Sequence, residues 1–178
     1  MTELQKKIQK SSYAAALAFY IMVMYPVGHF LNNLLRLFQL LTGKAQVDWI
    51  FHNVPHISIT TATAFLLSNC AVYLMASAAL IMAQRIFREI SKEYTPFKRL
   101  HVTRLRRITL LSTFCIIGDG LLKTWTAQLS NDPLQPGFFR MFLRDLNYTH
   151  FLLPIVICCF SFILDYACQL QTEADTTL

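Results

Sequence analysis

An uncharged run of twenty-seven residues, from Ile57 to Ala83, constrains the fold of this chain more than any other feature. As a helix, the run is long enough to cross the roughly 30 Å hydrocarbon core of a bilayer. A water-soluble domain of 178 residues has no use for such a segment on its surface and little room for it inside. The run therefore predicts a transmembrane helix, and the apolar share of 54% over the whole sequence agrees with a membrane protein.

Positive charge is concentrated on one predicted side of the membrane. Residues 84–107 carry eight of the sixteen Lys and Arg residues, and three more lie within the first twelve residues, whereas the two other connections together hold three. Because short loops rich in Lys and Arg stay in the cytoplasm, we expect residues 84–107 and both chain termini to be cytoplasmic. The expected location is the cell (inner or plasma) membrane. This asymmetry explains most of the net charge of +6, so direct nucleic-acid binding is not expected.

The alternation of apolar segments and polar connections predicts an all-α, polytopic membrane protein with one domain. Its expected architecture is a four-helix transmembrane bundle with short amphipathic interfacial helices on the outer side. Residues 138–146 fit such an interfacial helix. Residues 30–41 are also amphipathic, and the sequence leaves open whether they are embedded or interfacial. The four expected spans are residues 13–33, 57–83, 108–129 and 148–168.

Two charged residues, Asp119 and Lys123, stand one helical turn apart near the middle of the third expected span. A lone charge at that depth costs a few kcal/mol, so it needs a partner or water, and the spacing lets the two side chains neutralise each other along one helix face. With Arg36, in the apolar segment after the first span, they form a candidate intramembrane polar site. The alternative is an internal ion pair that only fixes helix orientation.

No enzyme, metal or cofactor signature is present in the sequence. We find no Ser-His-Asp set, phosphate loop or zinc-protease motif, and the five cysteines fall in apolar segments without metal-ligand spacing. His52 and His56 have a spacing that can share a metal on a helix, but Pro55 argues against a continuous helix there. We expect a protein that is not an enzyme and has no cofactor, with metal binding by the outer histidines as a weaker alternative.

Two short stretches, TPFKRLHVTRLRRI at residues 95–108 and QLQTEADTTL at residues 169–178, resemble the YoaS-like family of small bacterial four-helix membrane proteins of unknown function. In that family a Pro-Phe pair and an RLRRI-like run open the third helix, and the chain ends in a tail of the type ELQEEQDLTV. Members are often encoded beside small helix-turn-helix regulators, so the resemblance implies a regulatory partner in the cytoplasm. It transfers no activity or functional residue set. The matching residues are Pro96, Phe97, Arg104, Leu105, Arg106, Arg107 and Ile108, followed by Leu170, Gln171, Glu173, Asp175 and Thr177.

Two functions remain open from the sequence. The first is a regulatory or sensory membrane protein that contacts a cytoplasmic partner, such as a helix-turn-helix regulator, through its basic inner loop and C-terminal tail. The second is a small transporter, channel or immunity-type membrane protein that uses Asp119 and Lys123. The inner loop is also expected to bind anionic lipid headgroups, and a homo-oligomer is left open. The surface expected to bind the partner or lipid consists of Lys98, Arg99, Arg104, Arg106, Arg107, Glu173 and Asp175.

Overall fold

The computed structural model describes residues 3–43, 58–93, 98–129, 137–146 and 148–177, and these residues form helices and no strands. The all-α class predicted from the sequence is confirmed. Four helices are long, one is short, and a single 3-10 turn precedes the last helix. Their bounds are α1 (Glu3–Leu41), α3 (Ile59–Glu93), α4 (Arg99–Leu129), α5 (Phe138–Asp145), η1 (Tyr148–Phe151) and α6 (Leu152–Thr177).

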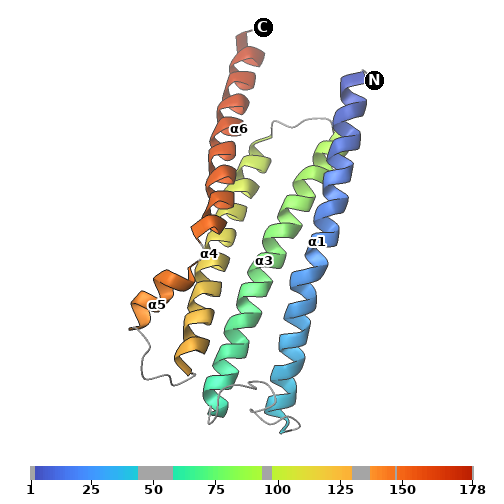
Figure 1. Ribbon diagram of the computed structural model, residues 1–178. Coiled ribbons are helices and arrows are strands. Elements are labelled where there is room, and N and C mark those ends of the chain that lie inside the picture. Colours follow the sequence, from blue (N-terminus) through green and yellow to red (C-terminus); the bar gives the residue numbers. More distant parts are fainter. Residues whose placement is uncertain (1–2, 44–57, 94–97, 130–136, 147, 178) are drawn as a thin grey trace.

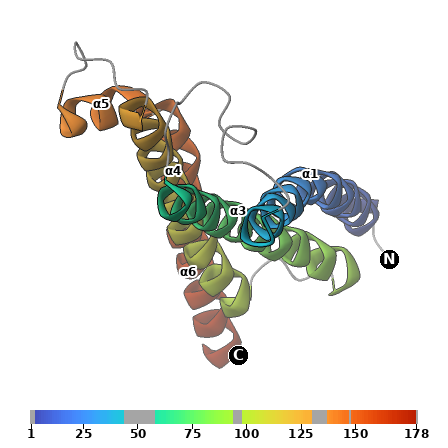
Figure 2. The same cartoon turned by 90° about the horizontal axis from the view of Figure 1, so that it is seen from below.

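The long helices form an open layer. Each packs mainly on its neighbour in the order α1, α3, α4, α6 (Figure 1). In the end-on view, α1, α3 and α4 follow one another in a row and α6 lies against α4 (Figure 2). Among the described residues α1 and α6, at the two edges of the layer, have no extensive packing against each other. The predicted four-helix transmembrane bundle is therefore not confirmed.

Three of the described helices are long and apolar enough to cross a membrane, over Lys6–Leu41, Ile59–Lys92 and Thr149–Ala174. Only 11%, 22% and 17% of their respective apolar windows are buried inside the chain, so most of their apolar side chains need another apolar surrounding. The helix α4, which contains the expected third span at 108–129, is not among the three. The charged residues Asp119 and Lys123, together with several Ser, Thr and Gly residues, lower the mean hydropathy of this helix.

The helix α1 extends well beyond the predicted first span of residues 13–33. It runs without a break from Glu3 to Leu41 and contains Pro26 in its interior. Residues 30–41, left open as embedded or interfacial, therefore continue the same helix and do not form a separate one. At about 1.5 Å per residue its 39 residues are longer than the hydrocarbon core is thick, so α1 either tilts or extends past it. The end of α1 near Leu41 packs on α3 through a cluster of Leu37, Leu40, Ala62 and Leu66.

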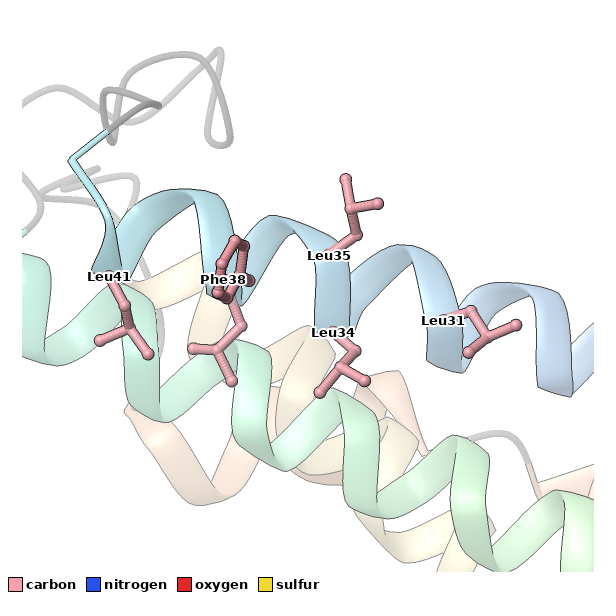
Figure 3. A pocket seen from close by; sticks show the side chains of 6 residues that line it. Leu31, Leu34, Leu35, Phe38 and Leu41 are labelled. Carbon is pink, nitrogen blue, oxygen red and sulfur yellow. The ribbon is translucent and has the colours of Figure 1, made fainter.

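An apolar hollow of about 580 Å³ lies along the same end of α1, beside α3 (Figure 3). Leucines and one phenylalanine line it, without a polar side chain that could orient a ligand. The hollow therefore has no polar group with which to bind a ligand specifically. Its lining residues are Leu31, Leu34, Leu35, Leu37, Phe38 and Leu41.

The α3–α4 interface depends on a close approach at Gly118. A Cβ atom added there would lie 2.7 Å from Cγ2 of Val72 on α3, which is too close for two carbon atoms. One turn earlier, the Cys115 thiol lies 3.5 Å from the Val72 carbonyl oxygen and donates to it. Small residues at such contacts let helix backbones approach and gain van der Waals energy. Nearer the chain termini the same interface buries Ala79, Ala83, Ile86 and Ile108.

The short helix α5 packs against α4 on the side away from α1. Residues 138–146 were expected to form an amphipathic helix, and they do so over Phe138–Asp145 with Met141 as its buried residue. The missing side chain of Gly120 makes room for α5, because an added Cβ would lie 3.1 Å from Leu146 and 3.3 Å from Phe142. The amphipathic helix thus covers α4 near Gly120, away from the end that holds the chain termini (Figure 1).

Both chain termini lie at one end of the molecule, together with the ends of α3 and α4 (Figure 1). The helix α3 continues past residue 83 to Glu93, and α4 begins at Arg99. The basic stretch 84–107 is therefore mostly helical, because it contains the last part of α3 and the first part of α4. Residues 94–97, which connect the two helices, lie outside the described part of the chain. The segments predicted as cytoplasmic thus share one end of the structure.

Changing Gly118 to Ala should destabilise the protein by about 1–3 kcal/mol, because the new methyl group overlaps the stiff side chain of Val72. Thermal unfolding in detergent measures the effect. The matched control is Gly28→Ala on α1, where nothing lies within 4 Å of the added Cβ and alanine is the better helix former. Adding Val72→Ala to Gly118→Ala should recover part of the loss. Equal unfolding temperatures for both single variants would contradict the close contact.

Candidate functional site

Asp119 and Lys123 form an ion pair along one face of α4. The Lys123 Nζ atom lies 2.6 Å from Asp119 Oδ2, one turn apart, as the spacing in the sequence predicts. Charge-assisted contacts of this length are among the stronger ones in proteins. The pair therefore neutralises its own two charges without help from a neighbouring helix.

The pair lies on the surface of the helical layer and not at a helix–helix interface. The Asp119 and Lys123 side chains are 50% and 53% exposed. In water such a pair contributes little, but in a bilayer its polar surface requires water or another polar component. The position of the pair therefore makes it accessible to a second molecule.

Aromatic and polar side chains of α1 and α3 lie near the pair. The ring of His29 stacks on Tyr73 with centroids 5.0 Å apart, and Tyr25 meets His29 edge-on at 4.5 Å. Tyr73 follows Val72, which contacts Gly118, the residue before Asp119, so Tyr73 lies near the ion pair. We call Tyr25, His29, Tyr73, Asp119 and Lys123 the polar cluster. Three helices contribute to it, and its side chains offer hydrogen-bond donors and acceptors to a polar ligand.

Arg36, the third residue of the predicted intramembrane site, is not part of the polar cluster. It lies two turns beyond His29 on the same face of α1 and is partly buried. Among the described residues it forms no ion pair with Asp119, whose carboxylate is taken by Lys123. The structure thus brings together two of the three predicted residues and adds Tyr25, His29 and Tyr73. The spacing of Tyr25 and His29 is a signal for one helix face, but nothing in the sequence marks Tyr73.

At the end that holds the termini, Arg104 ties α4 to α3. Its Nη1 atom lies 2.7 Å from Oε2 of Glu89, and only 19% of its side chain is exposed. The buried His101 places its Nδ1 3.9 Å from the same carboxylate oxygen. Glu89 was not singled out from the sequence, where it stands among several charged residues. Arg104 therefore mainly stabilises the packing of α4 on α3 and is less available to a partner.

Arg106 ties α4 to α6. Its Nη2 donates a hydrogen bond to Asp165 Oδ2 over 2.7 Å, and its guanidinium group lies 5.6 Å from the centre of the Phe162 ring. Together the two contacts hold a half-exposed arginine in one orientation. Two arginines of the predicted surface are thus engaged within the chain.

The remaining predicted surface residues are distributed as follows. Arg99 and Arg107 are exposed at the start of α4, and Lys98 is partly buried. Glu173 is exposed near the end of α6, whereas the side chain of Asp175 lies outside the described part. The exposed cationic surface is therefore smaller than the sequence indicates, with Arg99 and Arg107 as its clearest members.

The described residues contain no group of three His, Cys, Asp or Glu side chains that could hold a metal ion. His52 and His56, the pair considered for a metal, lie outside these residues. On the far side of α4, the buried Thr124 donates a hydrogen bond to the Gly120 carbonyl oxygen and lies 3.5 Å from Asp145 Oδ2. This contact joins α4 to α5, so the polar groups of Thr124 and Asp145 are explained by helix packing.

Comparison with known proteins yields no relative. No family model matches the chain, and neither a curated protein nor a solved structure matches it. The resemblance to the YoaS-like family stays a prediction.

Replacing Arg106 by Gln should lower the free energy of unfolding by about 1 kcal/mol, because both its ion pair with Asp165 and its contact with Phe162 are lost. Chemical or thermal unfolding in detergent measures the change. Arg107→Gln is the matched control, since Arg107 is the exposed neighbour on the same helix, and its effect should be within a few tenths of a kcal/mol. If the two variants unfold alike, Arg106 does not join α4 to α6.

Proposed function

We propose that this chain is an integral membrane protein of a regulatory or sensory kind, whose four long helices all cross the bilayer. Both termini and the ends of α3 and α4 then lie in the cytoplasm, where they meet a protein partner. The exposed apolar surfaces of α1, α3 and α6 support the membrane location. The gathering of eleven of the sixteen Lys and Arg residues in segments at one end supports the orientation.

The helix α4 is proposed as a span despite its polar residues. It lies between α3 and α6 in the layer, and both of these neighbours are apolar enough to cross a membrane. Its two central charges form a pair, which removes much of the cost of inserting either one alone. If α4 lay outside the bilayer while α3 and α6 crossed it, the contacts of α4 with both neighbours would be lost.

The partner surface is proposed at the cytoplasmic end. The observation that carries it is that two arginines of α4 are paired within the chain and two others are exposed. Arg104 and Arg106 are held by carboxylates of the chain itself. Arg99 and Arg107 are exposed beside them and can bind carboxylates of another protein. A helix-turn-helix regulator, the partner that the family resemblance implies, would dock here through an acidic surface.

Arg99→Gln combined with Arg107→Gln should weaken recovery of a specific cytoplasmic partner roughly tenfold, since two charge-assisted contacts are lost. The measurement is co-purification from solubilised membranes, with the captured protein identified and its binding then repeated with purified components. Arg140→Gln with Arg144→Gln removes the same charge at the opposite end and should leave recovery unchanged. Unchanged recovery in the first variant, with normal unfolding temperature, would contradict the proposed surface.

A second candidate function is transport or conduction through the polar cluster. It is favoured by the half-exposed ion pair in the second half of α4 and by Tyr73 nearby, on which the ring of His29 stacks. These groups could form a polar path or binding site once a second molecule or water covers them. In this case the cytoplasmic arginines would bind lipid and not a protein.

Asp119→Asn should abolish ion or proton flux in proteoliposomes loaded with a pH-sensitive dye, because the change removes the carboxylate that can take up a cation or proton. The protein should still accumulate in membranes, since Asn keeps the shape of the side chain. Thr113→Val, one and a half turns away on α4, is a control for loss of a polar group, because its hydroxyl bonds only to a backbone carbonyl of its own helix. Flux that persists in Asp119→Asn would rule out this role.

A further inference from the structure

A second hollow, of about 600 Å³, opens between α1 and α3 at the end that holds the termini. Volumes of this size accommodate small ligands. Three of its six lining residues are cationic and none is anionic. Residues Gln9, Lys10 and Tyr13 line it from α1, and Arg88, Ser91 and Lys92 from α3.

Among the described side chains, the carboxylate that follows Arg88 in the chain does not cancel the positive charge of this hollow. Glu89 follows Arg88 directly in the chain, but its side chain faces α4, where it pairs with Arg104 over 2.7 Å. Ser91 is buried and its hydroxyl donates to the Arg88 carbonyl oxygen, which holds the last turns of α3 in shape beneath the cations. The hollow is therefore an electropositive site on an ordered helical wall.

Exposed apolar stripes descend from the hollow along both helices. On α1, Leu17 and Met24 follow Lys10 at seven-residue steps, which keeps them close to one face, and both are exposed. On α3, Ile81 and Leu74 precede Arg88 at the same steps and are also exposed. Each stripe therefore joins a cation at the membrane surface to apolar side chains deeper in the bilayer.

We propose that this hollow binds the phosphate-bearing headgroup of an anionic lipid, whose acyl chains lie along the two stripes. The phosphate meets Lys10, Arg88 and Lys92 through charge-assisted hydrogen bonds. Free phosphate would use the cations but leave the apolar stripes unused, so the combination selects a lipid. The assignment rests on the proposed membrane location and not on the proposed cytoplasmic partner.

The test is a titration of detergent-solubilised, full-length protein with fluorescently labelled phosphatidylglycerol, with labelled phosphatidylcholine as the uncharged comparison. Arg88→Gln combined with Lys92→Gln should raise the dissociation constant for phosphatidylglycerol roughly thirtyfold. Lys10→Gln alone, on the other wall, should raise it about fivefold. Arg88→Lys should keep most of the affinity, and the unfolding temperature of each variant checks that the fold is intact.

Charge-matched and competition arms decide between the alternatives. Arg99→Gln with Arg107→Gln removes two cations from α4 at the same end and should leave the lipid affinity nearly unchanged. Equal weakening in both double variants would overturn the site, because the whole end would then attract anions without selection. Competition by glycerol 3-phosphate as strong as that by the lipid would overturn the lipid assignment. Partner recovery with Arg88→Gln and Lys92→Gln should stay normal, which separates this proposal from the partner surface.

Discussion

The packing of α3 between α1 and α4 fixes the positions of these two helices along the molecular axis relative to α3. On one side Leu37 and Leu40 meet Ala62 and Leu66, and on the other Gly118 lets α4 approach Val72. At each contact a small residue, Ala62 or Gly118, meets larger side chains at close range, and such close packing fixes the relative positions of the helices. These positions bring His29 onto Tyr73 and carry Asp119 and Lys123 to the same height. The polar cluster is therefore a consequence of the packing on α3.

The helical elements could be predicted from the sequence because local signals determine them. The uncharged run Ile57–Ala83 and the absence of strand patterns are sufficient to predict long apolar helices, and the structure confirms the all-α class. Helix ends were less predictable: α3 continues ten residues past Ala83, because the basic segment that follows has good helix formers and no break before Glu93. The open layer could not be predicted, since periodicity shows that a face is apolar but not what covers it.

The candidate site shows the same limit. The Asp119–Lys123 pair follows from their spacing on one helix, so it was predictable and the structure forms it. The partners of Arg104 and Arg106 were not, because Glu89 is 15 residues and Asp165 59 residues away along the chain, and only tertiary packing brings them together. Tyr73 was missed for the same reason. A surface of five basic residues read from the sequence is therefore reduced by ion pairs that the sequence cannot reveal.

The exposure of the ion pair on α4 bears on what the polar cluster is for. A pair that served only to orient helices would lie at an interface, as Arg106 and Asp165 do between α4 and α6. Asp119 and Lys123 join no two helices and remain about half exposed. Their mutual neutralisation lowers the cost of insertion but leaves dipolar groups that lipid chains solvate poorly. No further helix among the described residues covers them. In the membrane location that we propose, water or a second polypeptide would therefore have to do so.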